Sequence, residues 1–189
     1  GVMLLCTGRA TKRIDELQAG VKEYIASLRL GATTPSFDLE TQVDATYPTA
    51  HITRGLIEST LNQFIGRIEQ VPPAFSACKI DGVRAYDLAR SGQDVDLKPK
   101  ILVIDEIELL GYDKDSEELQ IRVVCSKGTY IRALARDIGA ALGSGAHLTA
   151  LRRTRVGDVT IDKCLSVEQA AELIKTVEIE MPDTSATKI

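Results

Sequence analysis

The sequence contains no tryptophan, only two histidines and three phenylalanines, and four cysteines that lie far apart. The cysteines form no CxxC pair, so the spacing of common zinc and disulfide frameworks is absent; they are Cys6, Cys78, Cys125 and Cys164. Widely spaced reduced thiols are typical of a cytosolic protein, and we therefore expect a cytoplasmic location. With so few histidines and no paired cysteines, we also expect no metal site.

Long apolar runs are missing as well. No stretch approaches the roughly 18 consecutive apolar residues of a membrane-spanning helix. The basic residues Arg9, Lys12 and Arg13 follow the apolar start, which is the wrong order for a signal peptide. The 189 residues are 44% hydrophobic, which suffices for the core of one domain, built mainly from aliphatic side chains because aromatics are scarce.

The net charge of −4 is unusual for a protein that binds nucleic acid, but the charges are sorted along the sequence. Residues 121–157 hold seven basic residues and one acidic residue, whereas residues 105–120 hold seven acidic residues and one basic residue. Chance clustering on solvated faces is one interpretation. The other is a basic face for phosphates and an acidic face turned away from them.

Hydrophobic periodicity and turn residues predict a series of strands and helices. The predicted strands or extended segments are residues 2–6, 24–30, 74–80, 101–110, 119–125, 148–156 and 159–161. The predicted helices are residues 12–17, 53–65, 84–91, 130–142 and 166–174, and residues 31–48 are predicted to form a loop. Strands in runs with helices between them favour an α+β fold over a doubly wound α/β fold.

The segment from Cys125 to Arg132 joins a predicted strand to a predicted helix. A strand, a tight glycine turn and a helix N-terminus in succession expose backbone N–H groups where an anion can bind. Lys127 adds a positive charge, and Arg132 and Arg136 lie four residues apart on one helix face. Taken alone, this pattern is also typical of a solvated helix start.

Four motifs follow one another along the chain: residues 6–12 (CTGRATK), 71–79 (VPPAFSACK), 127–132 (KGTYIR) and 145–153 (GAHLTALRR). Together they resemble, in order, conserved motifs of the TruB family of tRNA pseudouridine synthases. Four motifs in register are far more specific than any one of them, and residues 1 to about 175 follow the family throughout.

The resemblance implies an α+β fold with a mixed, largely antiparallel central sheet flanked by helices. It implies a catalytic domain over residues 1–175, with a small thumb-like insertion over about residues 71–98. Residues 176–189 are expected to form a polar C-terminal tail. This architecture agrees with the order of the elements predicted from the sequence.

The family isomerises a uridine to pseudouridine in the T loop of tRNA, at position 55. The N–C glycosidic bond breaks and the uracil is rejoined through carbon, which an aspartate nucleophile can achieve without a metal or an organic cofactor. The target uridine must leave the stacked loop, at a cost of roughly a few kcal/mol. The resemblance therefore implies a monomeric isomerase that binds the T stem-loop of tRNA, uses no cofactor and associates with no membrane.

The family's nucleophilic aspartate lies in a Gly-Thr-Leu-Asp-Pro-type segment directly before the equivalent of Gly1. The sequence starts with glycine and does not include that segment. We therefore expect a fragment of the catalytic domain that is inactive by itself. Other aspartates, such as Asp38, Asp81 and Asp137, stand in a different sequence context.

The resemblance assigns three catalytic-site residues. Arg132 matches the arginine that pairs with the nucleophilic aspartate, and a guanidinium can hold a carboxylate through two hydrogen bonds. Tyr24 matches the tyrosine that stacks on the flipped base and can assist proton transfer. Leu151 matches an apolar wall residue of the pocket. In isolation the three have ordinary alternatives, namely a surface ion pair, a core tyrosine and a strand leucine.

Seven further residues are predicted to contact the RNA: Lys12, Lys79, Lys127, Tyr130, His147, Arg152 and Arg153. Lys12 and Lys79 are alternatively supports of the site, and His147 is alternatively a structural residue. A second hypothesis for the whole chain is a non-catalytic RNA-binding module or tRNA-folding factor, which applies if Gly1 is the true start of the protein.

Overall fold

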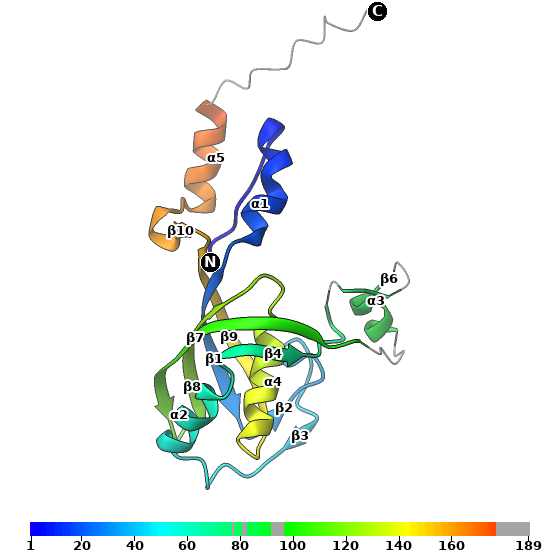
Figure 1. Cartoon of the computed structure of the whole chain (residues 1–189), viewed down its shortest axis with the longest axis vertical. Coiled ribbons are helices and arrows are strands. Elements are labelled where there is room, and N and C mark those ends of the chain that lie inside the picture. Colours follow the sequence, from blue (N-terminus) through cyan, green and yellow to red (C-terminus); the bar gives the residue numbers. More distant parts are fainter. Residues whose placement is uncertain (77, 81–82, 92–96, 177–189) are drawn as a thin grey trace, which may run out of the picture.

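The computed structural model describes residues 1–76, 78–80, 83–91 and 97–176; the side chains of residues 79–80, 83–84 and 89 also lie outside the described part. Its centre is a six-stranded sheet in the order β10-β9-β1-β8-β7-β4, in which all neighbouring strands pair antiparallel (Figure 1). The strands are β1 (Lys22–Leu30), β4 (Gly66–Gln70), β7 (Lys100–Asp113), β8 (Glu118–Cys125), β9 (Ala146–Val156) and β10 (Val159–Thr160).

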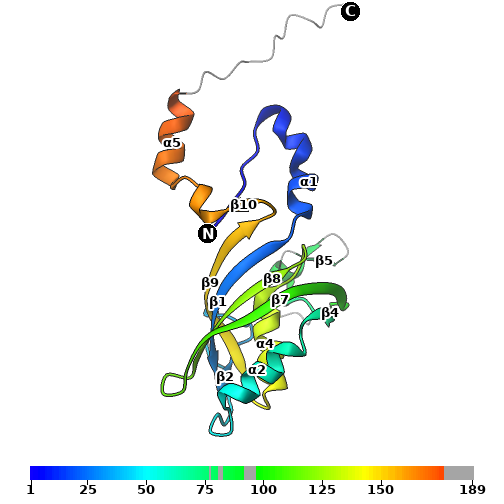
Figure 2. The same ribbon diagram turned by 60° about the vertical axis from the view of Figure 1, so that its left-hand side comes forward.

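Helices and short hairpins surround this sheet. The helical segments are η1 (Gly8–Arg13), α1 (Ile14–Ala19), α2 (Arg54–Asn62), α3 (Ala85–Arg90), α4 (Ile131–Ala141), η2 (Ile161–Lys163) and α5 (Val167–Thr176). The two short hairpins pair β2 (Ala32–Thr33) with β3 (Ala45–Thr46), and β5 (Lys79–Ile80) with β6 (Val83–Arg84). At one end of the sheet β1 and β9 run on to α1, β10 and α5, which project beyond it (Figure 2).

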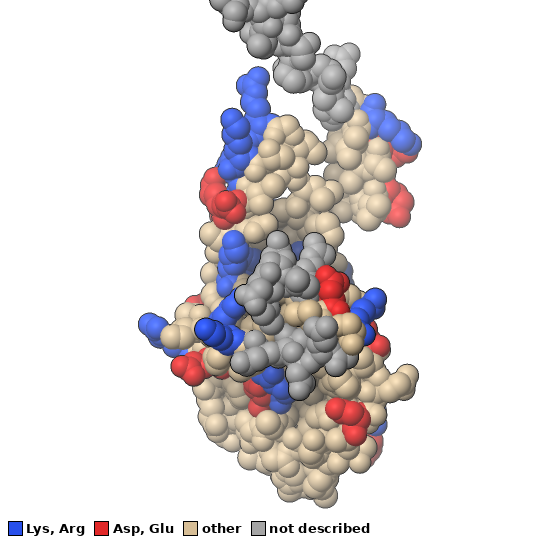
Figure 3. Space-filling model, turned by 90° about the vertical axis from the view of Figure 1, so that its right-hand side faces the viewer, with Lys and Arg blue, Asp and Glu red and all other residues tan. Residues whose placement is uncertain are grey.

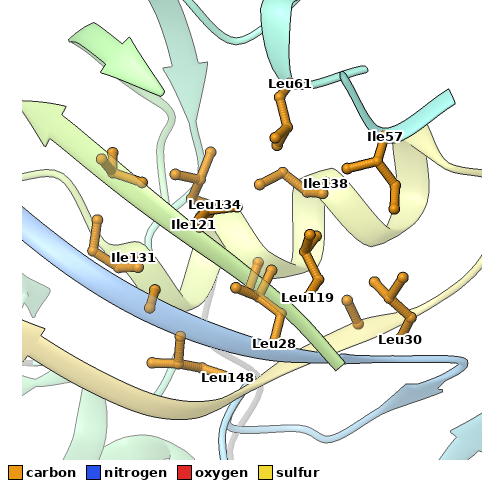
Figure 4. Packing of buried hydrophobic residues seen from close by; sticks show 14 of the residues in the cluster. Leu28, Leu30, Ile57, Leu61, Leu119, Ile121, Ile131, Leu134, Ile138 and Leu148 are labelled. Atoms are coloured by element: carbon orange, nitrogen blue, oxygen red, sulfur yellow. The ribbon is translucent and has the colours of Figure 1, made fainter. Parts of the chain in front are cut away.

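The hydrophobic core lies between α4 and the face of the sheet formed by β1, β8 and β9. Along β1, Ala26, Leu28 and Leu30 are fully buried, because alternate residues of a strand point to the same face. They pack against the apolar stripe of α4, which includes Leu134 and Ile138 (Figure 4). Helix α2 closes one end of this cluster with side chains such as Ile57 and Leu61.

Helix α4 approaches β9 closely because it carries a glycine at the contact. A Cβ atom on Gly139 would collide with the backbone nitrogen of Ala146. This close approach fixes the position of α4 on the sheet, and with it the position of the side chains in the first turn of the helix.

The antiparallel α+β architecture confirms the fold class predicted from the sequence. The strands at residues 24–30, 101–110, 119–125, 148–156 and 159–161 are found with small changes of boundary, as are the five predicted helices. Thr53 caps α2 by accepting a hydrogen bond from the backbone of Leu56, and Ser166 accepts one from Gln169 at the start of α5.

Several predictions of secondary structure were wrong. The predicted loop at residues 31–48 contains the short hairpin of β2 and β3. Residues 2–6 form no strand; Val2 makes a single pair of contacts with Arg153 of β9, while Met3 and Leu5 are exposed. Strand β4 was missed, and the predicted helix 53–65 ends at Asn62. The chain then enters β4 at Gly66, whose positive φ of 97° suits glycine. The predicted turn at residues 81–82 and the tail beyond residue 176 lie outside the described residues.

Within the described ranges, no helix is both long and apolar enough to cross a membrane. The four cysteines are free. Burial raises the pKa of the Cys125 thiol to about 11, so this side chain stays protonated in the core at neutral pH.

Replacing Leu28 by alanine tests whether β1 anchors the core. We expect the free energy of unfolding to fall by about 2–5 kcal/mol, because the side chain is fully buried between the sheet and α4 and its removal leaves a cavity. Leu173→Ala in α5 is the matched control: this leucine is 52% exposed, so the change should stay within about 0.5 kcal/mol. Equal effects in urea unfolding would contradict this description of the core.

Candidate active site and RNA-binding surface

The turn between β8 and α4 is held by hydrogen bonds to neighbouring strands. The Ser126 hydroxyl oxygen accepts a hydrogen bond from the backbone nitrogen of Val103 at 3.0 Å, and Gly128 takes a positive φ of 90° that suits glycine. Tyr130, the N-cap of α4, donates its backbone N–H to the side-chain oxygen of Gln70 at 2.9 Å, and Gln70 is fully buried. The first turn of α4 therefore starts from a fixed point.

Arg132 projects from that first turn and is held from two sides. Its Nη1 donates to Oδ2 of Asp38 at 3.1 Å, and its Nη2 donates to the carbonyl oxygen of Phe75 at 2.8 Å. The guanidinium is partly shielded, with 23% of the side chain exposed. Among the described residues, Asp38 is the carboxylate that pairs with Arg132, and sequence context alone did not reveal this.

The loop that carries Asp38 is well supported. Thr34 donates its hydroxyl to the carbonyl oxygen of Asp38 at 2.7 Å, and the Ser36 and Thr41 hydroxyls lie 2.9 Å apart. Thr34 and Ser36 are buried, and the carbonyl of Phe37 accepts a hydrogen bond from Leu148 of β9. These contacts hold the loop against β9, so that the Asp38 carboxylate faces α4.

Tyr24 lines a pocket of about 420 Å³. Basic residues share its lining: Lys22, Lys127 and Arg153. Its other walls are mainly apolar, with Met3, Leu4, Ile14, Leu17 and Val156. No acidic side chain is among the described residues that line it. A cationic rim around an apolar floor suits a nucleotide, whose base is apolar on its faces and whose phosphate is negative.

The electrostatics of this pocket follow from burial and from the crowding of positive charges. Burial raises the pKa of the Tyr24 phenol, so the ring stays neutral at physiological pH. Burial, followed by the charges of Lys127 and Arg153, lowers the pKa of Lys22. Bringing an anion into the pocket would relieve this repulsion, which favours a negatively charged ligand.

Leu151 lies on the same face of the sheet as Tyr24. Tyr24 pairs with Arg153 and Ala26 pairs with Leu151 across β1 and β9, and residues 24 and 26 alternate to one face. Leu151 is 46% exposed and borders a second hollow, of about 250 Å³, that Asp38 also lines. The three predicted catalytic-site residues are thus all on the side of the sheet that α4 covers.

The predicted basic face is divided between the two sides of the sheet. Arg153 faces the Tyr24 pocket, but Arg152 pairs with Ile25 and points to the opposite side. Arg122 also lies on that opposite side, where it forms ion pairs with Glu23 at 2.8 Å and Glu106 at 2.7 Å. The hypothesis of one continuous basic face is therefore wrong for Arg122 and Arg152, because neighbouring strand residues alternate.

The remaining predicted RNA contacts differ in accessibility. Lys12 is exposed in η1, and Lys127 is exposed beside Gly128. The Tyr130 hydroxyl lies 3.2 Å from the Cys78 sulfur. His147 is 5% exposed, and its Nδ1 lies 2.9 Å from the carbonyl oxygen of Ala32. This burial and the contact with Ala32 favour the structural alternative for His147, whereas its contact with RNA stays a prediction.

Lys79 belongs to β5, but its side chain lies outside the described part. Figure 3 shows lysine and arginine side chains recurring along one edge of the molecule, from the end that carries the N-terminal helices towards the thumb. Acidic side chains are interspersed with them on this view, whereas the lining of the Tyr24 pocket contains Lys22, Lys127 and Arg153 and no acidic side chain among the described residues.

Two family models match the chain. Residues 1–131 match "TruB family pseudouridylate synthase (N terminal domain)" and residues 132–184 match "tRNA pseudouridylate synthase B C-terminal domain". The second match begins inside α4, which shares one hydrophobic core with β1 and β8. The two matched segments therefore do not correspond to two separately packed units.

Curated relatives named tRNA pseudouridine synthase B include a protein of Phocaeicola vulgatus, 69% identical over 180 residues, with 95% of this chain and 76% of the relative covered. A protein of Flavobacterium johnsoniae is 50% identical over 167 residues, covering 88% of this chain and 72% of the relative.

Solved structures also match the chain, at lower sequence identity. A Cbf5-Nop10-Gar1 complex matches with a TM-score of 0.60 and 28% identity, over 84% of this chain and 37% of that chain. An H/ACA RNP bound to a substrate RNA containing 2′-deoxyuridine matches with a TM-score of 0.55 and 26% identity, over 83% of this chain and 35% of that chain. The extent of the family match and the identity to these curated relatives show that the chain belongs to the TruB family of pseudouridylate synthases.

Proposed function

We propose that this protein isomerises a uridine of tRNA to pseudouridine, and that its target is the uridine at position 55 of the T loop. The observation that carries the proposal is the two-sided anchoring of Arg132, on the same side of the sheet as Tyr24 and Leu151. Membership of the TruB family and relatives named for this activity support it.

The chemistry requires a carboxylate that attacks the target nucleotide while the base is held in place. The two hydrogen bonds that anchor Arg132 use two of the five N–H donors of a guanidinium, within the described residues. The other donors can orient a second carboxylate or a phosphate. We assign Asp38 the task of orienting Arg132, whereas a nucleophilic aspartate preceding Gly1 stays a prediction from the family resemblance.

Tyr24 supplies the surface on which the flipped base can stack. Its ring is neutral because burial raises the phenol pKa, and a neutral aromatic face suits an uncharged uracil. Stacking on an aromatic side chain contributes about 1–3 kcal/mol per base, comparable to the cost of removing a base from its stack. Leu151 adds an apolar wall on the same side of the sheet.

Lys127 and Arg153 are proposed to bind phosphates of the T stem-loop, and the presence of both in the lining of the Tyr24 pocket supports this assignment. A folded T stem-loop presents its backbone on both sides of the flipped nucleotide, so a cationic rim around one aromatic side chain fits it. We propose that the protein acts as a monomer in the cytoplasm, where its tRNA substrate is found.

Replacing Arg132 by lysine in the complete gene product tests the assignment of the active site. We expect single-turnover formation of pseudouridine to fall on the order of 100-fold, because lysine keeps the charge but cannot hold two oriented partners at once. The dissociation constant for tRNA should change little. Both quantities can be measured with unmodified tRNA carrying a radiolabelled target uridine.

Arg136→Lys is the control, one turn further along α4. Arg136 contacts its neighbour Asp137 and lies over the Phe37 ring, so we expect modest changes in both rate and affinity. A normal rate in Arg132→Lys, or a defect confined to affinity, would show that Arg132 is a phosphate contact. Tight tRNA binding without pseudouridine in the parent protein would favour the RNA-binding module instead.

A salt series tests the RNA contacts at the pocket rim. For each phosphate contact, log affinity should fall with log salt concentration with a slope of about −0.7 to −0.9. Replacing both Lys127 and Arg153 by alanine should therefore make the slope shallower by about 1.4 to 1.8. Arg152→Ala, on the opposite side of the sheet, should leave it unchanged. An equal loss of slope in Arg152→Ala, with thermal unfolding unchanged in all variants, would overturn this placement of the RNA.

A further inference from the structure

Five hydrogen bonds close a ring through three segments that are far apart in the sequence: the loop after β2, the thumb and the first turn of α4. They are Arg132 Nη1 to Asp38 Oδ2 (3.1 Å), Glu40 N to Asp38 Oδ1 (3.0 Å), Tyr86 Oη to Glu40 Oε1 (2.9 Å), Tyr86 N to the Ser76 carbonyl (3.0 Å) and Arg132 Nη2 to the Phe75 carbonyl (2.8 Å). We call these contacts the hydrogen-bonded ring.

The two partners of Arg132 sit on opposite arms of this ring. Asp38 belongs to the loop, which is supported by β9, whereas Phe75 belongs to the thumb. The thumb also contacts α4, where Arg136 donates to the Val71 carbonyl at 3.2 Å and the Cys78 sulfur lies 3.2 Å from the Tyr130 hydroxyl. Its contact with the loop adds to these contacts in setting the position of the Phe75 carbonyl. The docking of the thumb therefore decides whether the guanidinium is held from two sides or from one.

Tyr86 connects the two arms. Its hydroxyl donates to Glu40 of the loop, and its backbone N–H donates to the carbonyl of Ser76, the residue after Phe75. Its ring meets the Phe75 ring edge-on, with centroids 6.2 Å apart. The hydrogen bond to the Glu40 carboxylate raises the pKa of the Tyr86 phenol, so the donor stays protonated at neutral pH.

We infer that Glu40 and Tyr86 are positioning residues for the reaction: by docking the thumb on the loop, they hold the Phe75 carbonyl against Arg132. The inference rests on the proposed function, because it assigns these residues to the orientation of that active-site arginine. Neither side chain needs to touch the substrate. Loss of the contact between Glu40 and Tyr86 weakens the hydrogen bond from Arg132 Nη2 to the Phe75 carbonyl. It thereby lowers the fraction of molecules in which Arg132 is correctly oriented.

Arg90 adds a second, weaker link. Its Nη2 lies 3.1 Å from the Glu40 carboxylate, and its guanidinium carbon lies 4.5 Å from the centre of the Tyr86 ring. Because 61% of the Arg90 side chain is exposed, solvent screens its ion pair with Glu40, which therefore contributes little to the docking of the thumb. Of the two contacts of Glu40, the hydrogen bond from the uncharged Tyr86 hydroxyl should therefore matter more than the ion pair with Arg90.

Tyr86→Phe tests the inference with the smallest possible change, because it removes one oxygen and keeps both ring contacts. In the complete gene product we expect single-turnover pseudouridine formation to slow about fivefold, the size of one hydrogen bond, while the dissociation constant for tRNA changes less than about twofold. Tyr112→Phe in β7 is the matched control and should leave both quantities unchanged.

Two substitutions of Glu40 separate its hydrogen bond from its charge. Glu40→Gln keeps an oxygen that can accept from Tyr86 but loses the charge that faces Arg90, so it should react at close to the parent rate. Glu40→Ala removes the acceptor and should match Tyr86→Phe. The double variant Glu40→Ala/Tyr86→Phe should be no slower than either single variant, because both break the same link.

Amide hydrogen exchange reports on the ring without relying on catalysis. The amides of Ala85 and Tyr86 are bonded to the carbonyls of Cys78 and Ser76 within the thumb. In Tyr86→Phe we expect peptides covering residues 85–91 to exchange faster, with peptides of β1 unchanged. If the parent protein makes no pseudouridine, the proposed function fails and the inferred role in the reaction fails with it. If the parent protein is active but exchange in Tyr86→Phe is unchanged, the inference alone fails.

Several results would overturn the inference: a parent-like rate in Tyr86→Phe, additive losses in the double variant, a defect that lies wholly in affinity, or unchanged exchange over residues 85–91. Recovery in Glu40→Gln together with loss in Glu40→Ala supports it. Equal losses in both Glu40 variants would assign the effect to the charge and to Arg90, and would also overturn it.

Discussion

The pairing of β1 on both of its edges is the constraint on which the rest of the structure depends. β8 and β9 bind it along nearly its whole length, so its register with each neighbour is fixed. Side chains alternate between the two faces of β1, and this alternation buries Ala26, Leu28 and Leu30 beneath α4. It also points Tyr24 to the same face, at the end of the strand that extends beyond the core. A slip of one residue would expose the core and remove Tyr24 from the pocket together.

Basic residues gathered at one pocket reconcile a net charge of −4 with an RNA substrate. On the α4 side, Lys22, Lys127 and Arg153 gather around the pocket. On the other side, Arg122 is bound by Glu23 and Glu106. Electrostatic attraction of RNA depends on the local potential at the site and falls off within about 10 Å at 0.1 M salt, so acidic residues behind the sheet weaken it little.

Long periodic elements could be predicted from the sequence because apolar residues recur in them at several regularly spaced positions. β1, β8 and α4 each repeat their buried positions several times, and the stable core forms from these elements. Strand β4 could not be predicted, because its five residues contain a single large apolar side chain, Ile68, which gives too short a pattern. The apolar residues 2–6 have the composition of a strand, but Met3 and Leu5 face solvent in the described structure.

The candidate site was predictable where a motif carried the information and not where the contact was between distant segments. Tyr24, Arg132 and Leu151 were proposed by resemblance. Strand register puts Tyr24 and Leu151 on the side of the sheet that is covered by α4, the helix that carries Arg132. The division of Arg152 from Arg153 needed only strand alternation, once β9 was known. The partnership of Arg132 with Asp38 spans 94 residues, and no local pattern could have revealed it.

That partnership shows why the orientation of one arginine should depend on three segments at once. A guanidinium on a single helix turn has several rotamers of similar energy, and a helix by itself cannot choose among them. A carboxylate on one side and a carbonyl on the other define the plane as well as the position of the group. The carbonyl comes from the thumb, whereas the carboxylate comes from the loop after β2. A displacement of the thumb relative to that loop would therefore change the orientation of Arg132 through one backbone oxygen, without any movement of the core.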